Sequence, residues 1–167
     1  MITDNKNKLT IFCESSKMVE QELRTKLDSI MKLAEDDGAI SDELDTESLR
    51  TNKLLTKYLR MYTEESLVLK DMYTTKEKIK LERWKYYSGK QTERYSVDNG
   101  ILHEKILKMD IDKYLAADDK LIAINDLVTV QKAIVDYLEK ITKEISSNRN
   151  FQIKTALDWR KFVSGAN

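Results

Sequence analysis

Apolar side chains recur at three- and four-residue intervals along most of this chain, which is the spacing of amphipathic α-helices. The pattern predicts helical blocks at about 16–34, 45–87, 103–115 and 116–146, and a last short helix that begins near residue 151. The sequence has no proline and four glycines, so little interrupts long helices. We therefore predict an all-α protein, with a long helical hairpin or coiled coil in its amino-terminal half and an oligomerisation bundle in its carboxy-terminal half.

Breaks in the pattern suggest three regions. Residues 1–44 are predicted to form an amino-terminal extension with one helix and an acidic loop, and residues 45–99 a long helix with a basic-aromatic segment and a loop. Residues 100–167 are predicted to form a helical oligomerisation region, with a break at Ser146-Ser147-Asn148. At 1.5 Å per residue the second helix would be roughly 60 Å long, so it must pack on the first helix or on a neighbouring subunit.

Lys and Arg together number 29, and so do Asp and Glu, so the net charge is zero. The distribution of charge along the chain is more informative. Residues 70–94 hold eight basic and four acidic side chains, and residues 140–161 hold six and two, so each segment has a net charge of +4. Residues 1–55 hold eight basic and twelve acidic side chains. A neutral chain with segregated charge still creates a local field that a charged partner meets.

The stretch from residue 76 to residue 94 interleaves basic and aromatic residues. Cations neutralise phosphates regardless of sequence, and flat rings stack on bases, so this composition suits a groove for single-stranded nucleic acid. The alternative is a solvated helical face whose rings pack inward. The DNA-binding candidates are Lys76, Lys78, Lys80, Arg83, Trp84, Lys85, Tyr86, Tyr87, Lys90 and Arg94.

A second candidate surface lies in the carboxy-terminal half, where branched apolar residues form a stripe wider than a surface helix needs. Spacing alone does not separate a monomer core from an oligomer interface. The predicted interface consists of Leu127, Val128, Ile134, Val135, Leu138, Ile141, Phe151, Trp159 and Phe162.

Enzyme chemistry finds little support, and we predict no catalytic site, no metal and no cofactor. His103 has no cysteine nearby in the sequence, and the four glycines form no phosphate-binding loop. The acidic residues Asp110, Asp112, Asp118 and Asp119 lie next to lysines, so ion pairs explain them better than a Mg²⁺ site. The lone Cys13 and the absence of a long apolar run lead us to expect a soluble, intracellular protein that contacts no membrane.

Three stretches resemble the UvsY family of recombination mediators from T-even phages. Arg83–Gly89 is similar to the family's R-L-D-Y-Y-S-G, and Leu115–Asp118 to its L-S-A-D. The ending Arg149–Gly165 is similar to R-x-F-x-I-K followed by D-x-R-x-F and G. The resemblance covers roughly residues 45–167, and we find no counterpart for the first 40 or so residues.

This resemblance implies a helical, homo-oligomeric ring, hexameric or heptameric, that binds single-stranded DNA in the cytoplasm of the phage's host. It also implies partners: a RecA-like phage recombinase and the phage single-strand DNA-binding protein, which the mediator helps to displace. The family's basic motif has Lys two positions before the Arg that matches Arg83. Here that position is Leu81, and Lys85 replaces the motif's Asp. A structural scaffold without nucleic-acid binding is the alternative function.

Overall fold

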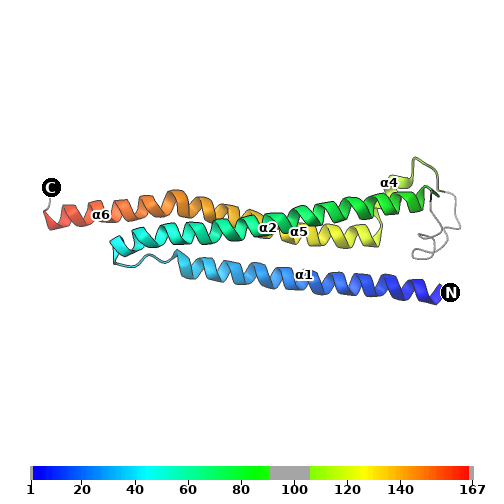
Figure 1. The fold of residues 1–167 in the computed structure, drawn as a ribbon, viewed down its shortest axis with the longest axis horizontal. Helices are drawn as coiled ribbons and strands as arrows, with labels where there is room; N and C mark the ends of the chain where they lie inside the picture. The colour runs from blue at the N-terminus through cyan, green and yellow to red at the C-terminus, as the bar shows by residue number, and fades with distance from the viewer. Residues whose placement is uncertain (1, 91–105, 166–167) are drawn as a thin grey trace. The chain divides into compact units, whose positions relative to one another are not determined.

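A computed structural model describes residues 2–90 and 106–165, with side chains from residue 14 onward (Figure 1). Its elements are α1 (Ile2–Gly38), α2 (Leu44–Tyr87), α4 (Ile111–Ala116), α5 (Asp119–Glu144), the π-helical turn η1 (Ile145–Arg149) and α6 (Asn150–Ser164). No strand occurs among these residues, which confirms the all-α class. The coiled-coil detail stays a prediction.

The long second helix is predicted almost to the residue, since α2 runs from Leu44 to Tyr87. It stays unbroken through Thr74 and Thr75, although two β-branched residues lower helix propensity. Their hydroxyls donate to the carbonyls of Lys70 (3.1 Å) and Asp71 (2.9 Å), one turn earlier. These bonds satisfy the hydroxyls within the helix, so the pair causes no break.

Four other predicted helix limits are wrong. Helix α1 extends to both sides of the predicted 16–34. The third helix, expected from about residue 103, begins only at Ile111 in the described part of the chain, after the turn at 108–110. The expected break at Ser146-Ser147-Asn148 is instead the π-helical turn η1, which joins α5 to α6. The two serine hydroxyls there donate to the Lys143 carbonyl in the preceding turn, so they find partners within the helix and the chain continues into α6 without a break.

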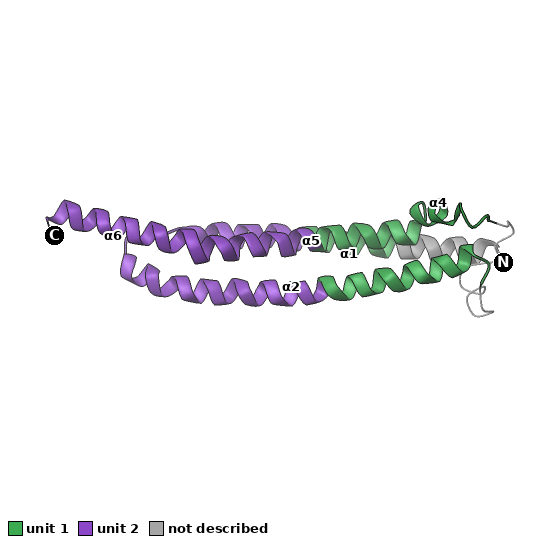
Figure 2. Cartoon of the chain, turned by 90° about the horizontal axis from the view of Figure 1, so that it is seen from above, with its two compact units in different colours: residues 1–24, 69–131 green, residues 25–68, 132–167 purple. Residues whose placement is uncertain are grey.

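The helices contribute to two compact units (Figure 2): unit 1 contains residues 1–24 and 69–131, and unit 2 contains residues 25–68 and 132–167. Each unit takes pieces from all three predicted regions, and the division into those regions stays a prediction. In unit 1, α4 and the start of α5 bury one apolar cluster, and side chains of α2 pack against it. The buried members of this cluster are Ile111, Leu115, Leu121 and Ile124.

Unit 2 contains the first half of α2, which packs with the end of α1 and the second half of α5. Tyr58, Ile134 and Leu138 are completely buried there, and Ile30 of α1 is almost so. Lys26 of α1 pairs with Glu65 of α2 at 2.6 Å. The partner that the long second helix requires is therefore supplied, in this unit, by helices of its own chain.

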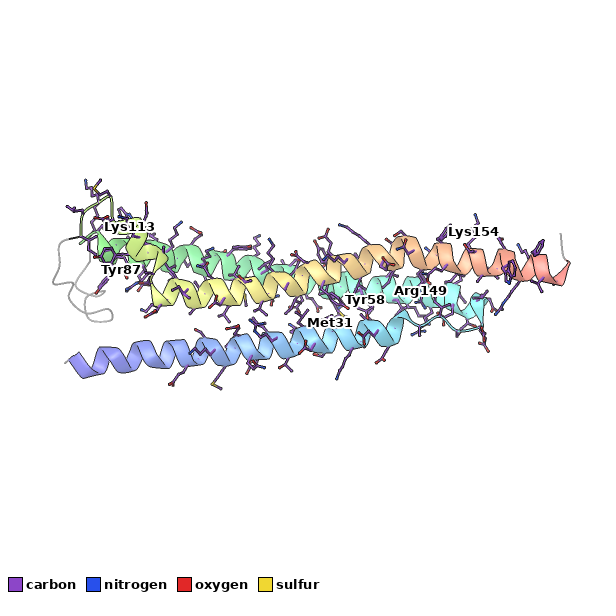
Figure 3. The ribbon with its side chains drawn as sticks, turned by 180° about the vertical axis from the view of Figure 1, so that it is seen from behind. Met31, Tyr58, Tyr87, Lys113, Arg149 and Lys154 are labelled. Carbon is purple, nitrogen blue, oxygen red and sulfur yellow. The ribbon has the colours of Figure 1, made fainter. Side chains whose placement is uncertain are left out.

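Arg149, which lies on η1 (Figure 3), is buried at the end of α1 in unit 2. Its Nη1 atom donates to the carbonyls of Asp37 and Gly38, both at 3.1 Å, and its guanidinium pairs with the buried Glu47 of α2. The last carbonyls of a helix have no partner within the helix, so a buried helix end needs such a donor. Arg149 thus joins α1, α2 and η1.

Two carboxylates of this cluster make the stability of unit 2 sensitive to acid. Burial raises the pKa of Asp37, but hydrogen bonds from Lys57 and Tyr58 outweigh it and hold that pKa below its ordinary value of 3.8. Burial likewise raises the pKa of Glu47, and bonds from Ser41, Arg50 and Arg149 lower it overall below 4.5. Both pKa values are lower in the folded chain than in the unfolded chain. The ionised carboxylates therefore stabilise the fold fully at a pH above their ordinary pKa values, and this stabilisation is lost as the pH falls through the pKa values of the folded chain.

We therefore expect the urea midpoint of unfolding to be constant above about pH 5 and to fall below about pH 4. Circular dichroism at 222 nm over a pH series measures it. Asp37→Asn removes one of the two titrating groups, so its midpoint should be lower at pH 7 but should fall less steeply in acid. An equally steep fall in the variant would contradict this assignment.

Candidate nucleic-acid interface

Eight of the ten predicted DNA-binding residues, those from Lys76 to Tyr87, occupy the last turns of α2, and the helix divides them between two faces. Met72, Lys76, Ile79 and Arg83 follow the three- and four-residue spacing of the face that packs into unit 1. The opposite face is exposed. It presents Lys78, Lys80, Leu81 and Trp84, and the half-buried Lys85 lies beside them.

Trp84 is the aromatic side chain of this segment that meets solvent most openly, with 37% of its surface exposed. The Nζ atom of Lys90, just past the helix end, lies 5.1 Å from the centre of the Trp84 ring. A flat ring beside a cation is the pairing that a nucleotide needs, because the ring stacks on the base while the cation neutralises the phosphate. We call Lys78, Lys80, Trp84, Lys85 and Lys90 the basic-aromatic face.

Arg83 lies on the other side of the helix and is only 7% exposed. Its Nε atom donates to Oδ2 of Asp118 at 2.6 Å, and the Tyr87 hydroxyl donates to the same oxygen at 2.7 Å. Arg83 Nη2 donates to the Tyr87 hydroxyl at 3.3 Å, which closes a ring of three bonds. We call Arg83, Tyr87 and Asp118 the clasp. It joins the end of α2 to the start of α5.

Asp118 was not predicted to belong to this site, and it has a second role there. Its Oδ1 atom accepts the backbone N–H groups of Lys120 (3.0 Å) and Leu121 (3.2 Å), so it caps the amino-terminal end of α5. Two signals in the sequence point to it: an aspartate just before a helix, and its place in the Leu115–Asp118 stretch. Neither signal reveals that its partner is Arg83.

The two tyrosines of the segment face inward with Arg83. The Arg83 guanidinium lies 4.4 Å from the Tyr86 ring centre and 5.2 Å from that of Tyr87, and the two rings pack edge to face. Tyr87 also lies 5.6 Å from Tyr114 of the Ile111–Ala116 helix. Burial raises the pKa of Tyr87, and its bond to Asp118 raises it further, so the hydroxyl stays a donor at neutral pH. The alternative of inward-packed rings thus describes the tyrosines, whereas Trp84 is exposed.

The remaining site predictions are placed as follows. Lys76 is half-buried, and Arg94 and His103 lie outside the described residues. Asp110 pairs with Lys113 at 2.8 Å (Lys113 is labelled in Figure 3) and Asp118 with Arg83, which accounts for two of the four clustered aspartates. In the part of the chain that the structure describes, no cluster of acidic, His or Cys side chains has the makings of a metal site. No helix within 2–90 or 106–165 is both long and apolar enough to cross a membrane.

The predicted oligomer interface separates into two groups. On α5, Ile134 and Leu138 are completely buried within unit 2, and Val128 of unit 1 and Val135 of unit 2 are nearly so, with Leu127 and Ile141 half-buried. These side chains form the core of a single chain. On α6, by contrast, the three predicted aromatic residues are largely exposed: Phe151, Trp159 and Phe162.

Comparison with known proteins agrees with this architecture. The model of a family described as "Recombination, repair and ssDNA binding protein UvsY" matches residues 14–166. A crystal structure of the bacteriophage T4 recombination mediator protein UvsY has a similar fold, with a TM-score of 0.72 and 20% sequence identity over 82% of this chain and 96% of that one. A crystal structure of the same T4 protein in a second lattice type gives a TM-score of 0.71 and 20% sequence identity over 80% of this chain and 98% of that one. No curated protein sequence matches. Since the family match begins at residue 14, the expectation that the first 40 or so residues have no counterpart is wrong from residue 14 onward.

Proposed function

We propose that this chain, which belongs to the UvsY family, is a recombination mediator that binds single-stranded DNA through the basic-aromatic face of α2. The observation that carries this proposal is the exposed Trp84 with a lysine over its ring, on a helix face that also bears Lys78 and Lys80. Lysines there neutralise phosphates, and Trp84 stacks on one base. Neither contact reads sequence, so binding is indifferent to it.

The proposal has two further steps, which the resemblance to this family implies. The protein acts as a homo-oligomeric ring of six or seven subunits, and it loads a RecA-like recombinase by displacing a single-strand DNA-binding protein. The exposed aromatic side chains of α6 are consistent with assembly, because apolar surface of this kind marks interfaces. The loading step is tested by measuring the rate at which the recombinase hydrolyses ATP on DNA coated with the single-strand binding protein.

DNA binding is tested by titrating a fluorescent oligothymidine with the protein at several salt concentrations. We expect the logarithm of the affinity to fall linearly with the logarithm of the salt concentration, by about 0.7 per phosphate contact. Lys80→Gln should lower this slope by that amount. A scaffold without nucleic-acid function would show no binding at any salt concentration, which would refute the proposal.

Leu81 offers a gain-of-function test on the same face. It is 53% exposed, and it lies three and four residues before Trp84 and Lys85, so its side chain neighbours both. Leu81→Lys places a cation where the family motif has one, and it should raise the salt slope by about 0.7 and tighten binding several-fold. Leu81→Gln is the matched control, since it is polar but uncharged. If the two variants bind alike, DNA does not lie along this face.

A further inference from the structure

We propose that Arg83 is a positioning residue, which acts on DNA binding through the clasp and does not bind phosphate itself. This inference rests on the proposed DNA binding by the basic-aromatic face. It assigns a role to the arginine of the family-like motif that neither its charge nor its place in a basic segment suggests. It also explains why the Arg83–Gly89 and Leu115–Asp118 stretches occur together, because the first supplies Arg83 and Tyr87 and the second supplies Asp118.

The positive charge of Arg83 is already neutralised by a carboxylate within the protein. Its side chain and that of Asp118 are both buried, at 9% and 3% exposure, and the pair is closed by Tyr87. For Arg83 to reach a phosphate, this ion pair would have to open and leave Asp118 buried without its cation, which is strongly unfavourable. The freed carboxylate would also repel the phosphate. The exposed lysines on the opposite side of α2 reach DNA without either cost.

The clasp holds the part of α2 that carries the DNA contacts. Helix ends fray, because their last carbonyls lack partners within the helix. Here the end is closed by backbone bonds from Ser88 to Trp84 (2.9 Å) and from Lys90 to Lys85 (3.0 Å), with Gly89 in the left-handed conformation at φ +69°. Arg83 and Tyr87 stand on either side of Trp84 and Lys85 in the sequence, and both are tied to Asp118. The clasp therefore fixes the direction in which Trp84 and Lys90 point.

Substitutions that keep or remove charge separate the two roles of Arg83. Arg83→Lys keeps the cation but loses the guanidinium bonds to Asp118 and Tyr87. Asp118→Asn keeps the size but loses the acceptor charge, and Asp119→Asn, at an exposed neighbour, is its matched control. Tyr87→Phe removes a single hydroxyl and is the mildest change. Each variant is made in the full chain, and affinity for oligothymidine is measured at 10 °C alongside helix content and particle mass.

We expect Arg83→Lys and Asp118→Asn each to weaken binding by about tenfold, while Asp119→Asn binds as tightly as the unmodified chain. Helix content and particle mass stay unchanged, so the loss is local. The double variant should be no weaker than either single one, because both break the same clasp. Tyr87→Phe should weaken binding less, by about threefold.

The opposite pattern would overturn the inference. A phosphate-binding Arg83 predicts that Arg83→Lys binds almost normally and that Asp118→Asn binds as tightly as the unmodified chain or more so. If a variant fails to fold, Tyr87→Phe still decides, because full affinity without this hydroxyl would contradict the clasp. If the unmodified chain does not bind DNA, the proposed function fails. The clasp itself is then still measured, by equal and non-additive losses of thermal stability in the Arg83 and Asp118 variants.

Discussion

Replacing Arg149 by alanine is expected to lower the free energy of unfolding by about 3–5 kcal/mol, which is the usual cost of removing one partner from a buried ion pair. Glu47 is 3% exposed and would keep its charge with only the partly exposed Arg50, 3.3 Å away, as a counterion. The carbonyls of Asp37 and Gly38 at the end of α1 would lose their donor as well. Urea unfolding at fixed protein concentration, followed by circular dichroism, measures the change.

The chain supplies its own control for this experiment. Arg60 pairs with Glu64 one turn further along α2, but both side chains are exposed, at 81% and 57%. Pairs of this kind contribute little, so Arg60→Ala should leave unfolding unchanged. A double replacement, Arg149→Met with Glu47→Leu, removes both charges and should recover much of the lost stability. Equal effects of the Arg149 and Arg60 substitutions would show that the buried network contributes nothing.

The sequence predicts the elements of this fold where local pattern determines them. Helix α2 has an uninterrupted amphipathic spacing and ends at Tyr87, two residues before Gly89, so both of its limits could be inferred. Helix α1 is longer than expected because no proline or glycine stops it before residue 38, although its apolar stripe is shorter. The turn η1 could not be inferred, because Ser146-Ser147-Asn148 is a sequence that suits the end of a helix as well as a π-helical turn within one.

The candidate site, too, could be predicted from the sequence only in part. Composition singled out residues 76–94, but a run of cations and rings does not say which of them face inward. Arg83 and Trp84 are neighbours in sequence and lie on different faces, because one step along a helix turns a side chain by about 100°. The partner that withdraws Arg83 from solvent lies 35 residues away, on another element. Only tertiary structure brings that pair together.

Loss of the α6 aromatic residues is expected to have the largest effect on function. Trp159 and Phe162 are 66% and 71% exposed, and their ring centres lie 5.7 Å apart. Phe151 and Trp159 also border an open, shallow depression on the surface of the same helix. Among the α6 residues that the structure describes, Ile153 is the buried one, so α6 contributes little else to the core of unit 2. An aromatic surface so poorly covered by its own chain suits contact with a second copy.

We therefore expect the pair Trp159→Ser and Phe162→Ser to convert the native particle into smaller, soluble species of unchanged helix content, as measured by native mass spectrometry without DNA. Because a ring multiplies weak contacts, affinity for long single strands should fall by about 100-fold, and recombinase loading should fail with it. Lys154→Ser with Lys161→Ser is the matched control on the same helix, and it should keep the full mass. By contrast, Ile134→Asp with Leu138→Asp should unfold the chain, because both positions are completely buried in unit 2. A particle of full mass after loss of both α6 rings would place the subunit contact on another helix.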